Sequence, residues 1–306
     1  MTPAQSQQIL VLGGSGFVGH HLCHALSQHG DRVTVPTRRM PARSVQMLPG
    51  VSVVSADVHD AQTLRQLVQG HDAVVNLVAI LHGSAAAFEQ VHVRLPETLA
   101  RVCAESGVRR LVHVSALGAN PQGPSMYQRS KGRGEVLLQA AAERGELDLT
   151  LLQPSVIFGR DDRFINLFTQ LQRVFPVMPL AGARTRFQPV WVGDVVQALV
   201  QTLAQRRTIG HTYELAGPDV LSLRELVQLA GRHGECPRPV LPLPHAVGWL
   251  QALAMEWLPG PTLMSRDNLA SMQVDNVASG HHPGLSALGV ATPRRLVQVF
   301  PAGGRG

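Results

Sequence analysis

Three glycines spaced three residues apart, Gly13, Gly16 and Gly19, follow the first apolar run of the chain and limit what this segment can form. Residues 9–12 have the composition of a buried strand, and residues 17–29 have a helical pattern. Glycines at such a junction allow a tight turn, bring backbone N–H groups close to a pyrophosphate and permit close packing of helix on strand. The helix N-terminus would then face the phosphates. The segment therefore predicts a dinucleotide-binding turn.

The rest of the first half alternates in the same way between β-branched or aliphatic runs and helical patterns. This alternation predicts a parallel sheet covered by helices on both faces. The expected strands are residues 9–12, 32–37, 51–56, 73–78, 111–114 and 150–152, and the expected helices include 17–29, 60–69, 86–106 and 127–144. We therefore expect an α/β fold with a doubly wound parallel sheet of the Rossmann type.

After Pro154 the alternation loosens, and clusters of Gly and Pro mark loops between shorter helices. We expect a Rossmann domain over residues 1–153 and a smaller, mostly helical substrate or lid domain over residues 154–306. Parts of the second half, at about 188–216, are expected to return to the Rossmann core.

The bulk composition argues against several classes of protein. The chain has 306 residues, 44% of them hydrophobic, and no apolar stretch of the length needed to cross a bilayer. Its start lacks the basic and apolar regions of a signal peptide, so we expect a cytoplasmic protein, with peripheral contact at the inner face of the membrane left open. The net charge of +6 is scattered and aromatic residues are few, which argues against nucleic acid as a partner.

Two histidine pairs, His20-His21 and His281-His282, raise the question of a metal site. No carboxylate or cysteine lies at ligand spacing from either pair, so we predict solvated or capping histidines and no metal. The three cysteines are far apart in the sequence, and we interpret them as reduced packing residues.

The second predicted strand is followed by Arg38 and Arg39, where an NAD-specific site usually carries Asp or Glu for the ribose 2′-hydroxyl. A guanidinium fits a 2′-phosphate by charge and by bidentate geometry. Arg38, assisted by Arg39, therefore predicts NADP(H) in preference to NAD(H). The alternative is that both arginines lie on a solvated loop.

Two further strand ends lie at the edge of the sheet where ligands bind in such folds. A carboxylate at Asp57 could accept a hydrogen bond from the adenine amino group, and the small residues around Ala79 would let the chain pass close to the ribose. The full set of predicted cofactor contacts is Gly13, Ser15, Gly16, Phe17, Val18, Gly19, Arg38, Arg39, Asp57, Val58, Leu77, Val78, Ala79, Lys131 and Pro154.

Tyr127 and Lys131 lie four residues apart and hence on one face of a helix. A tyrosine with a pKa of about 10 transfers protons poorly at neutral pH unless nearby positive charge stabilises its phenolate. Lys131 is the one lysine among 27 basic residues, and it stands where the wide guanidinium of arginine would not substitute. Ser115 ends the fifth predicted strand and completes a candidate catalytic set, although it could equally cap a turn. A surface helical pair is the alternative for Tyr127 and Lys131.

Together these residues resemble the extended, atypical branch of the short-chain dehydrogenase/reductase family. The likeness continues through residues 153–160, 188–195 and 213–218. Within that branch, residues 127–131, 159–164, 265–268 and 283–285 resemble the NADPH-binding accessory subunit of respiratory complex I and its bacterial relatives, often named NAD-dependent epimerase/dehydratase. The resemblance implies that the glycine turn, Arg38 and Asp57 hold the cofactor and that Tyr127 and Lys131 lie near the nicotinamide.

Two departures from the family pattern leave two functions open. Typical members carry a helix asparagine before the fifth strand, where this chain has His92, and the interval of 12 residues from Ser115 to Tyr127 is short for an extended member. The first hypothesis is an NADP(H)-dependent oxidoreductase that acts on a carbonyl or alcohol, which includes quinone-related compounds. The second is an accessory or assembly factor that holds NADP(H) without turnover.

The segment 246–258, which contains Trp249 and Trp257, is the candidate for contact with a membrane or a respiratory partner. The alternative that we favour is a lid that packs over the substrate cleft. The second half of the sequence carries no signature that identifies the substrate.

Overall fold

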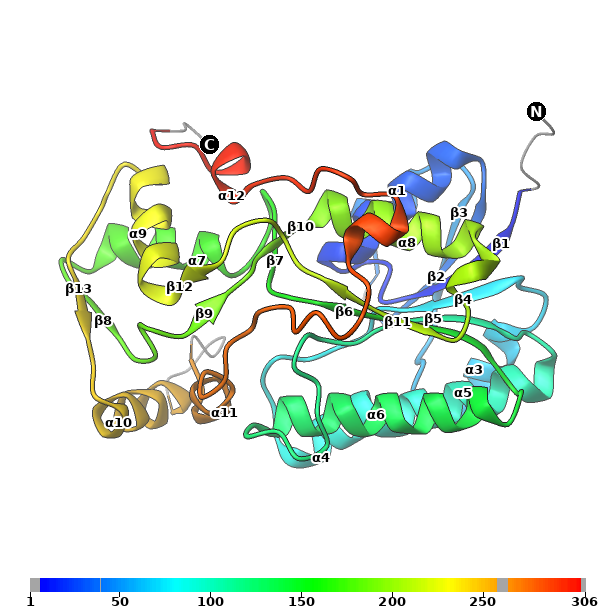
Figure 1. Ribbon diagram of the computed structural model, residues 1–306. Coiled ribbons are helices and arrows are strands. Elements are labelled where there is room, and N and C mark those ends of the chain that lie inside the picture. The colour runs from blue at the N-terminus through cyan, green and yellow to red at the C-terminus, as the bar shows by residue number, and fades with distance from the viewer. Residues whose placement is uncertain (1–5, 39, 258–263, 304–306) are drawn as a thin grey trace.

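A seven-stranded parallel sheet forms the centre of the computed structural model, which describes residues 6–38, 40–257 and 264–303 (Figure 1). The strand order is β11-β6-β5-β4-β1-β2-β3. The strands are β1 (Gln8–Leu12), β2 (Arg32–Thr37), β3 (Val51–Ser55), β4 (Ala73–Asn76), β5 (Arg110–Val114), β6 (Asp148–Pro154) and β11 (His211–Leu215). The order reverses between β1 and β4, and doubly wound sheets bind their ligands at this reversal, beyond the carboxyl ends of the strands. The predicted Rossmann fold is confirmed.

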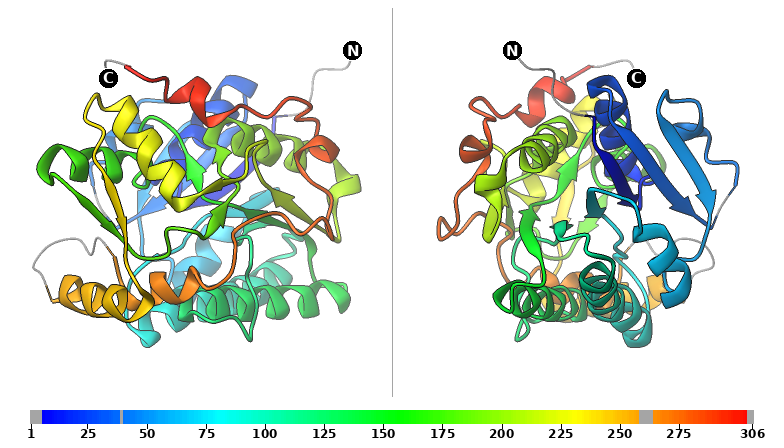
Figure 2. Two further views of the ribbon diagram at one scale, coloured as in Figure 1. Left: turned by 60° about the vertical axis from the view of Figure 1, so that its left-hand side comes forward. Right: turned by 90° about the vertical axis from the view of Figure 1, so that its right-hand side faces the viewer.

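Helices cover both faces of this sheet, and Figure 2 shows the layers from two further sides. One face carries α1 (Phe17–His29), α2 (Arg43–Gln46) and α8 (Val192–Ala204), which share a hydrophobic core with the sheet. The other face carries α3 (Ala61–Val68), α4 (Ala85–Glu89), α5 (Leu95–Ser106) and α6 (Met126–Glu143), with a second core beneath α3, α5 and α6. The strands are buried on both faces, which explains their nearly continuous apolar sequences.

A smaller lobe with its own core packs beyond one end of the sheet. Its helices are α7 (Ile165–Val174), α9 (Leu223–His233), α10 (His245–Glu256), α11 (Arg266–Ser271) and α12 (Leu296–Val299). Its short strands pair as β10 (Val190–Trp191) with β7 (Ile157–Phe158), β12 (Leu221–Ser222) with β9 (Arg186–Phe187), and β13 (Val240–Pro242) with β8 (Met178–Leu180). Between them the chain returns to the large part, because α8 packs on α1 and β11 pairs with β6.

The helix predicted over residues 86–106 is present, but it is not α-helical throughout. Five residues of π-helix, Gln90–Arg94, separate α4 from α5. Pro96, at the start of α5, has no N–H to donate to the carbonyl of residue 92, so the regular ladder cannot pass through this point. The carbonyl of His92 instead faces α6, where a Cβ added at Gly134 would lie 2.1 Å from its oxygen.

Candidate cofactor and active site

The glycine turn between β1 and α1 has the geometry of an anion-binding turn. Gly13 has φ +82°, which favours glycine, and a Cβ added at Gly19 would lie 2.2 Å from the carbonyl oxygen of Gly13. Gly16 is the N-cap of α1 and has no side chain to accept hydrogen bonds from the first-turn amides. Ser15 and Gly16 are exposed. The helix N-terminus is therefore open to the pyrophosphate of a dinucleotide.

The carboxyl end of β2 presents Arg38 to solvent, without an ion pair among the described residues. Burial lowers the pKa of His59; the Asp57 carboxylate opposes this shift and the Arg38 guanidinium adds to it. Asp57 and Arg38 are therefore both near the His59 imidazole. Asp57 accepts a hydrogen bond from the backbone N–H of His59 at 3.1 Å. Arg39 lies outside the described residues.

The end of β4 touches the glycine turn. A Cβ added at Gly13 would lie 3.2 Å from the carbonyl carbon of Leu77 and 3.3 Å from the nitrogen of Val78. The backbone N–H of Val78 is held by the side chain of Asn76 at 3.1 Å. Pro154 lies at the end of β6, and its carbonyl accepts from the N–H of Leu117 at 2.9 Å.

Lys131 is a buried cation and not part of a surface pair. Its side chain is 2% exposed, and Nζ donates to the carbonyl oxygen of Val114 at 2.8 Å. Burial lowers the pKa of Lys131 to about 8, against the opposing effect of the Glu135 carboxylate. The alternative of an exposed helical pair is therefore wrong for Lys131.

Tyr127 is half-buried, and its ring packs edge-on against His92 and Phe88, with centroid separations of 5.5 and 6.4 Å. Burial raises the pKa of Tyr127 to about 12. The direction is opposite to the predicted one, because the cause of the shift is desolvation of the phenolate.

Glu135, which the sequence analysis missed, acts on Lys131 and is itself in a buried group with Ser115 and a second missed residue, Gln153. Gln153 donates to both carboxylate oxygens of Glu135, at 2.9 and 3.0 Å. The side chains of Ser115, Glu135 and Gln153 are all buried. Burial raises the pKa of Glu135, with opposing contributions from Ser115, Gln153 and Lys131. The hydroxyl of Ser115 lies near Glu135 and has no hydrogen-bond partner among the described residues. A signal was present, since Glu135 continues the four-residue spacing of Tyr127 and Lys131.

His92 links the loop after β4 to α6. Its Nε2 accepts from the backbone N–H of Ile80 at 3.1 Å, and its Nδ1 lies 2.9 Å from Oγ of Ser130. Burial lowers the pKa of His92 to about 3, with Lys131 adding to the shift, so the ring is neutral. Because Nε2 accepts, the proton is on Nδ1, and Nδ1 donates to Ser130.

Asp267, in the small lobe, holds the start of the helix that carries Tyr127. Its two carboxylate oxygens accept from the backbone N–H groups of Met126 and Tyr127, at 2.6 and 3.1 Å. Ser125 and Gln128 add a capping box at the same end. The contact joins α11 to α6, which are far apart in sequence, and no local pattern predicts it.

A cavity of about 590 Å³ lies between the two parts of the molecule beside Tyr127. Its lining residues come from the α4 region, the start of α6, α10 and α11: His82, Gly83, Ser84, Phe88, Met126, Trp249, Glu256, Ser265, Arg266 and Asp267. Arg266 pairs with Glu256 at 3.0 Å and lies over the ring of Trp249. The volume suits a small-molecule ligand with both apolar and polar groups. In the predicted lid, Trp249 thus faces the cavity, whereas Trp257 is 83% exposed.

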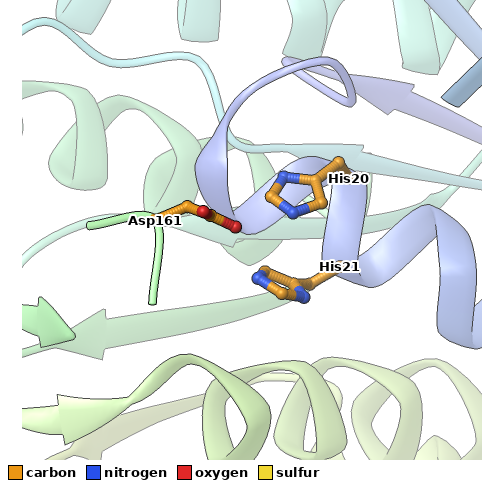
Figure 3. A group of neighbouring side chains, drawn as sticks. All are labelled: His20, His21 and Asp161. Atoms are coloured by element: carbon orange, nitrogen blue, oxygen red, sulfur yellow. The ribbon is translucent and has the colours of Figure 1, made fainter. Parts of the chain in front are cut away.

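The fold adds a carboxylate to the first histidine pair. His20 and His21 of α1 meet Asp161, from the loop after β7, and one ligand atom from each lies within 4.8 Å of the others (Figure 3). The sequence analysis, which considered only ligand spacing along the chain, missed this carboxylate because Asp161 is close in space and remote in sequence.

The fold and the glycine turn define a dinucleotide-binding Rossmann protein. The chain belongs to the NAD dependent epimerase/dehydratase family, whose sequence profile matches residues 9–216. It is 30% identical to NADH dehydrogenase (ubiquinone) 1 alpha subcomplex subunit 9, mitochondrial, of Mus musculus over 305 residues, which cover 94% of this chain and 78% of that protein. The extended short-chain dehydrogenase/reductase resemblance is confirmed.

Two further proteins are similar to this chain, one in sequence and one in fold. A ceramide reductase of Caulobacter vibrioides is 28% identical over 194 residues, or 63% of this chain and 59% of that protein. The structure of DesIV, a dTDP-glucose 4,6-dehydratase from Streptomyces venezuelae with NAD and TYD bound, superposes with a TM-score of 0.69 at 23% identity and covers 77% of this chain and 84% of DesIV. Within the described residues, every helix is too short or too polar to span a membrane.

Proposed function

We propose that the protein is an NADP(H)-dependent oxidoreductase that transfers hydride between the nicotinamide and a carbonyl or alcohol. The observation that carries the proposal is Lys131, a fully buried ammonium beside the ends of β5 and β6. An ionised lysine at such a depth is costly, and strongly perturbed groups of this kind concentrate at functional sites.

The residues at the edge of the sheet fit a bound NADP(H). The open N-terminus of α1 supplies backbone donors for the pyrophosphate. Arg38 is exposed and has no competing ion pair among the described residues, so its guanidinium is free for the 2′-phosphate. Asp57 is exposed nearby and would accept from the adenine amino group.

The nicotinamide, when bound, supplies or accepts the hydride. Tyr127 exchanges the proton with the substrate oxygen, and the positive charge of Lys131 stabilises its phenolate. In this role the positive charge of Lys131 has to lower the pKa of Tyr127 from the value of about 12 that burial gives it. The buried hydroxyl of Ser115 has no hydrogen-bond partner among the described residues, so it would be free to bind the substrate oxygen. The substrate enters from the cavity that Phe88 and Met126 line.

Two variants test the proposal in the full-length protein. Arg38→Ser should weaken NADPH binding by about tenfold or more and leave NADH binding unchanged, because a charge-assisted hydrogen bond contributes about 1.5–3 kcal/mol. Tyr127→Phe should bind NADPH normally and lose carbonyl- or quinone-dependent NADPH oxidation. Equal loss of NADH and NADPH binding in the first variant would refute the cofactor assignment, and unchanged oxidation in the second would refute the role of Tyr127.

A second function, an accessory or assembly factor that holds NADP(H) without turnover, is favoured by two observations. The raised pKa of Tyr127 describes a site that is not poised for proton transfer. A relative that matches 94% of this chain is a subunit of NADH dehydrogenase (ubiquinone). In this function the exposed side of α10, with Trp257, would contact a respiratory partner or the inner face of the membrane.

Retention of the cofactor distinguishes the two functions. Mass spectrometry of the purified protein should find a stoichiometric, slowly exchanging dinucleotide if the protein is an accessory factor. An exchangeable cofactor together with substrate-dependent NADPH oxidation supports the enzyme. Co-purification with membranes or respiratory subunits supports the accessory role, and absence from such fractions counts against it.

A further inference from the structure

The first turn of α1 and the loop after β7 form a second polar cluster, separate from the residues assigned to Tyr127 and Lys131. His20 and His21 project from α1, and the Asp161 carboxylate points towards the two imidazoles (Figure 3). One ligand atom from each residue lies within 4.8 Å of the other two. Two imidazoles and one carboxylate form a ligand set that zinc uses in proteins.

Both histidines present a ring nitrogen to this cluster. Nδ1 of His20 lies 3.1 Å from the carbonyl oxygen of Gly16, and a hydrogen bond from Nδ1–H leaves Nε2 with its lone pair for a ligand. Nε2 of His21 is buried and has no hydrogen-bond partner. An unpartnered buried nitrogen calls for an explanation, and a bound cation provides one.

The loop that carries Asp161 is fixed in place by its neighbour in sequence. Asp162 is buried, and its carboxylate accepts from the backbone N–H groups of Gly159, Phe164 and Ile165 at 2.7–3.1 Å. Asp161 itself is exposed and makes no ion pair or hydrogen bond with the described residues. Its carboxylate is therefore free to act as a ligand on a preformed loop.

We propose that His20, His21 and Asp161 bind one divalent cation of the zinc class. Zinc holds nitrogen and oxygen ligands at about 2 Å, which places them about 3.3 Å apart in a tetrahedron, so small side-chain rotations complete the site. Water fills the fourth position. The ion joins the helix whose N-terminus faces the cofactor phosphates to the loop that leads into the small lobe.

The probe is Zn²⁺ alone, added to full-length protein stripped with a chelator and without dinucleotide. Competition with a chromophoric chelator should give one Zn²⁺ per chain. Asp161→Asn and His21→Asn should each weaken binding by at least about tenfold, since even loss of a supporting hydrogen bond to a metal ligand has effects of that size. Zn²⁺ should also raise the Tm of the wild type and not that of Asp161→Asn.

His24→Asn is the matched control, because His24 is exposed on the same helix, one turn beyond His20 and outside the three-residue group. It should bind Zn²⁺ within about twofold of the wild type. Loss of binding in the His24 variant with normal binding in Asp161→Asn would assign the metal to a surface pair of helical histidines and overturn the proposal. Absence of saturable binding in the wild type would also overturn it. Circular dichroism of each variant establishes that the fold is intact.

Discussion

Replacement of Lys131 by methionine should not destabilise the protein at neutral pH, although it removes a buried hydrogen bond. The folded protein holds the pKa of Lys131 at about 8, against an ordinary value of 10.5. At about 1.4 kcal/mol for each pH unit between the two values, the buried ammonium costs about 3 kcal/mol below pH 8. The variant no longer contains the buried ammonium, which stabilises it by that amount. It also leaves the Val114 carbonyl without its hydrogen-bond donor, which destabilises it by about 1–3 kcal/mol. At pH 7 the variant should therefore match the wild type or exceed it by up to about 2 kcal/mol.

The pH dependence gives the sharper test, because it does not depend on the lost hydrogen bond. Between pH 8 and 10.5 the folded wild type gives up its proton at Lys131 before the unfolded chain does. The unfolded state then binds more protons, so this group makes the wild type more stable as the pH rises. The difference in free energy of unfolding, wild type minus Lys131→Met, should increase by about 2.5 kcal/mol from pH 7 to pH 10.

Urea unfolding followed by far-ultraviolet circular dichroism at pH 7, 8, 9 and 10 measures this difference, because groups that do not interact with Lys131 titrate alike in the two proteins. Arg133→Met is the control: Arg133 lies on the same helix in an exposed pair with Glu89, so its loss should cost at most about 1 kcal/mol at every pH. A Lys131→Met variant less stable than the wild type by the same amount from pH 7 to pH 10 would refute the assignment of Lys131 as a strained cation.

Three further perturbations test other parts of the structure. Gly19→Ala should destabilise the protein by more than about 2 kcal/mol and abolish NADPH binding, because its Cβ would lie 2.2 Å from the Gly13 carbonyl oxygen. Thermal unfolding measures the loss of stability, and NADPH fluorescence measures the loss of binding. Asp267→Asn should cost about 1 kcal/mol of stability and lower kcat, because the amides of Met126 and Tyr127 lose a charged acceptor; urea unfolding and steady-state kinetics check this. If α10 contacts a membrane, Trp257→Glu should weaken sedimentation with anionic vesicles at least about tenfold and leave NADPH binding unchanged.

The central sheet could be predicted from sequence because each of its strands is a short apolar run, and the helices between them follow local periodicity. The π-helical segment could not be predicted in the same way. Pro96 has no N–H to donate within the helix, but the residue type alone does not say whether the helix ends, bends or widens there. The raised pKa of Tyr127 was missed for a different reason: the spacing to Lys131 is local, whereas burial depends on the whole fold.

Long-range contacts were beyond the sequence analysis in the same way. Asp161 and Asp267 each come from a segment after β6, and each meets a helix of the first half. No sequence pattern around either carboxylate indicates which residues it contacts. Each carboxylate reaches its own partners only because the folded chain brings distant segments together. Glu135 is the exception, because its spacing from Lys131 was visible in the sequence.

The position of Tyr127 depends on both parts of the molecule. Its ring rests on Phe88 and His92 of the large part, whereas its backbone N–H is held by Asp267 of the small lobe. Asp267 also lines the cavity beside Tyr127, together with the Arg266–Glu256 pair. A ligand that fills this cavity and competes for Asp267 must therefore change the hydrogen bonds at the start of α6. We therefore expect ligand binding between the two parts and the orientation of Tyr127 to be coupled through the Asp267 carboxylate.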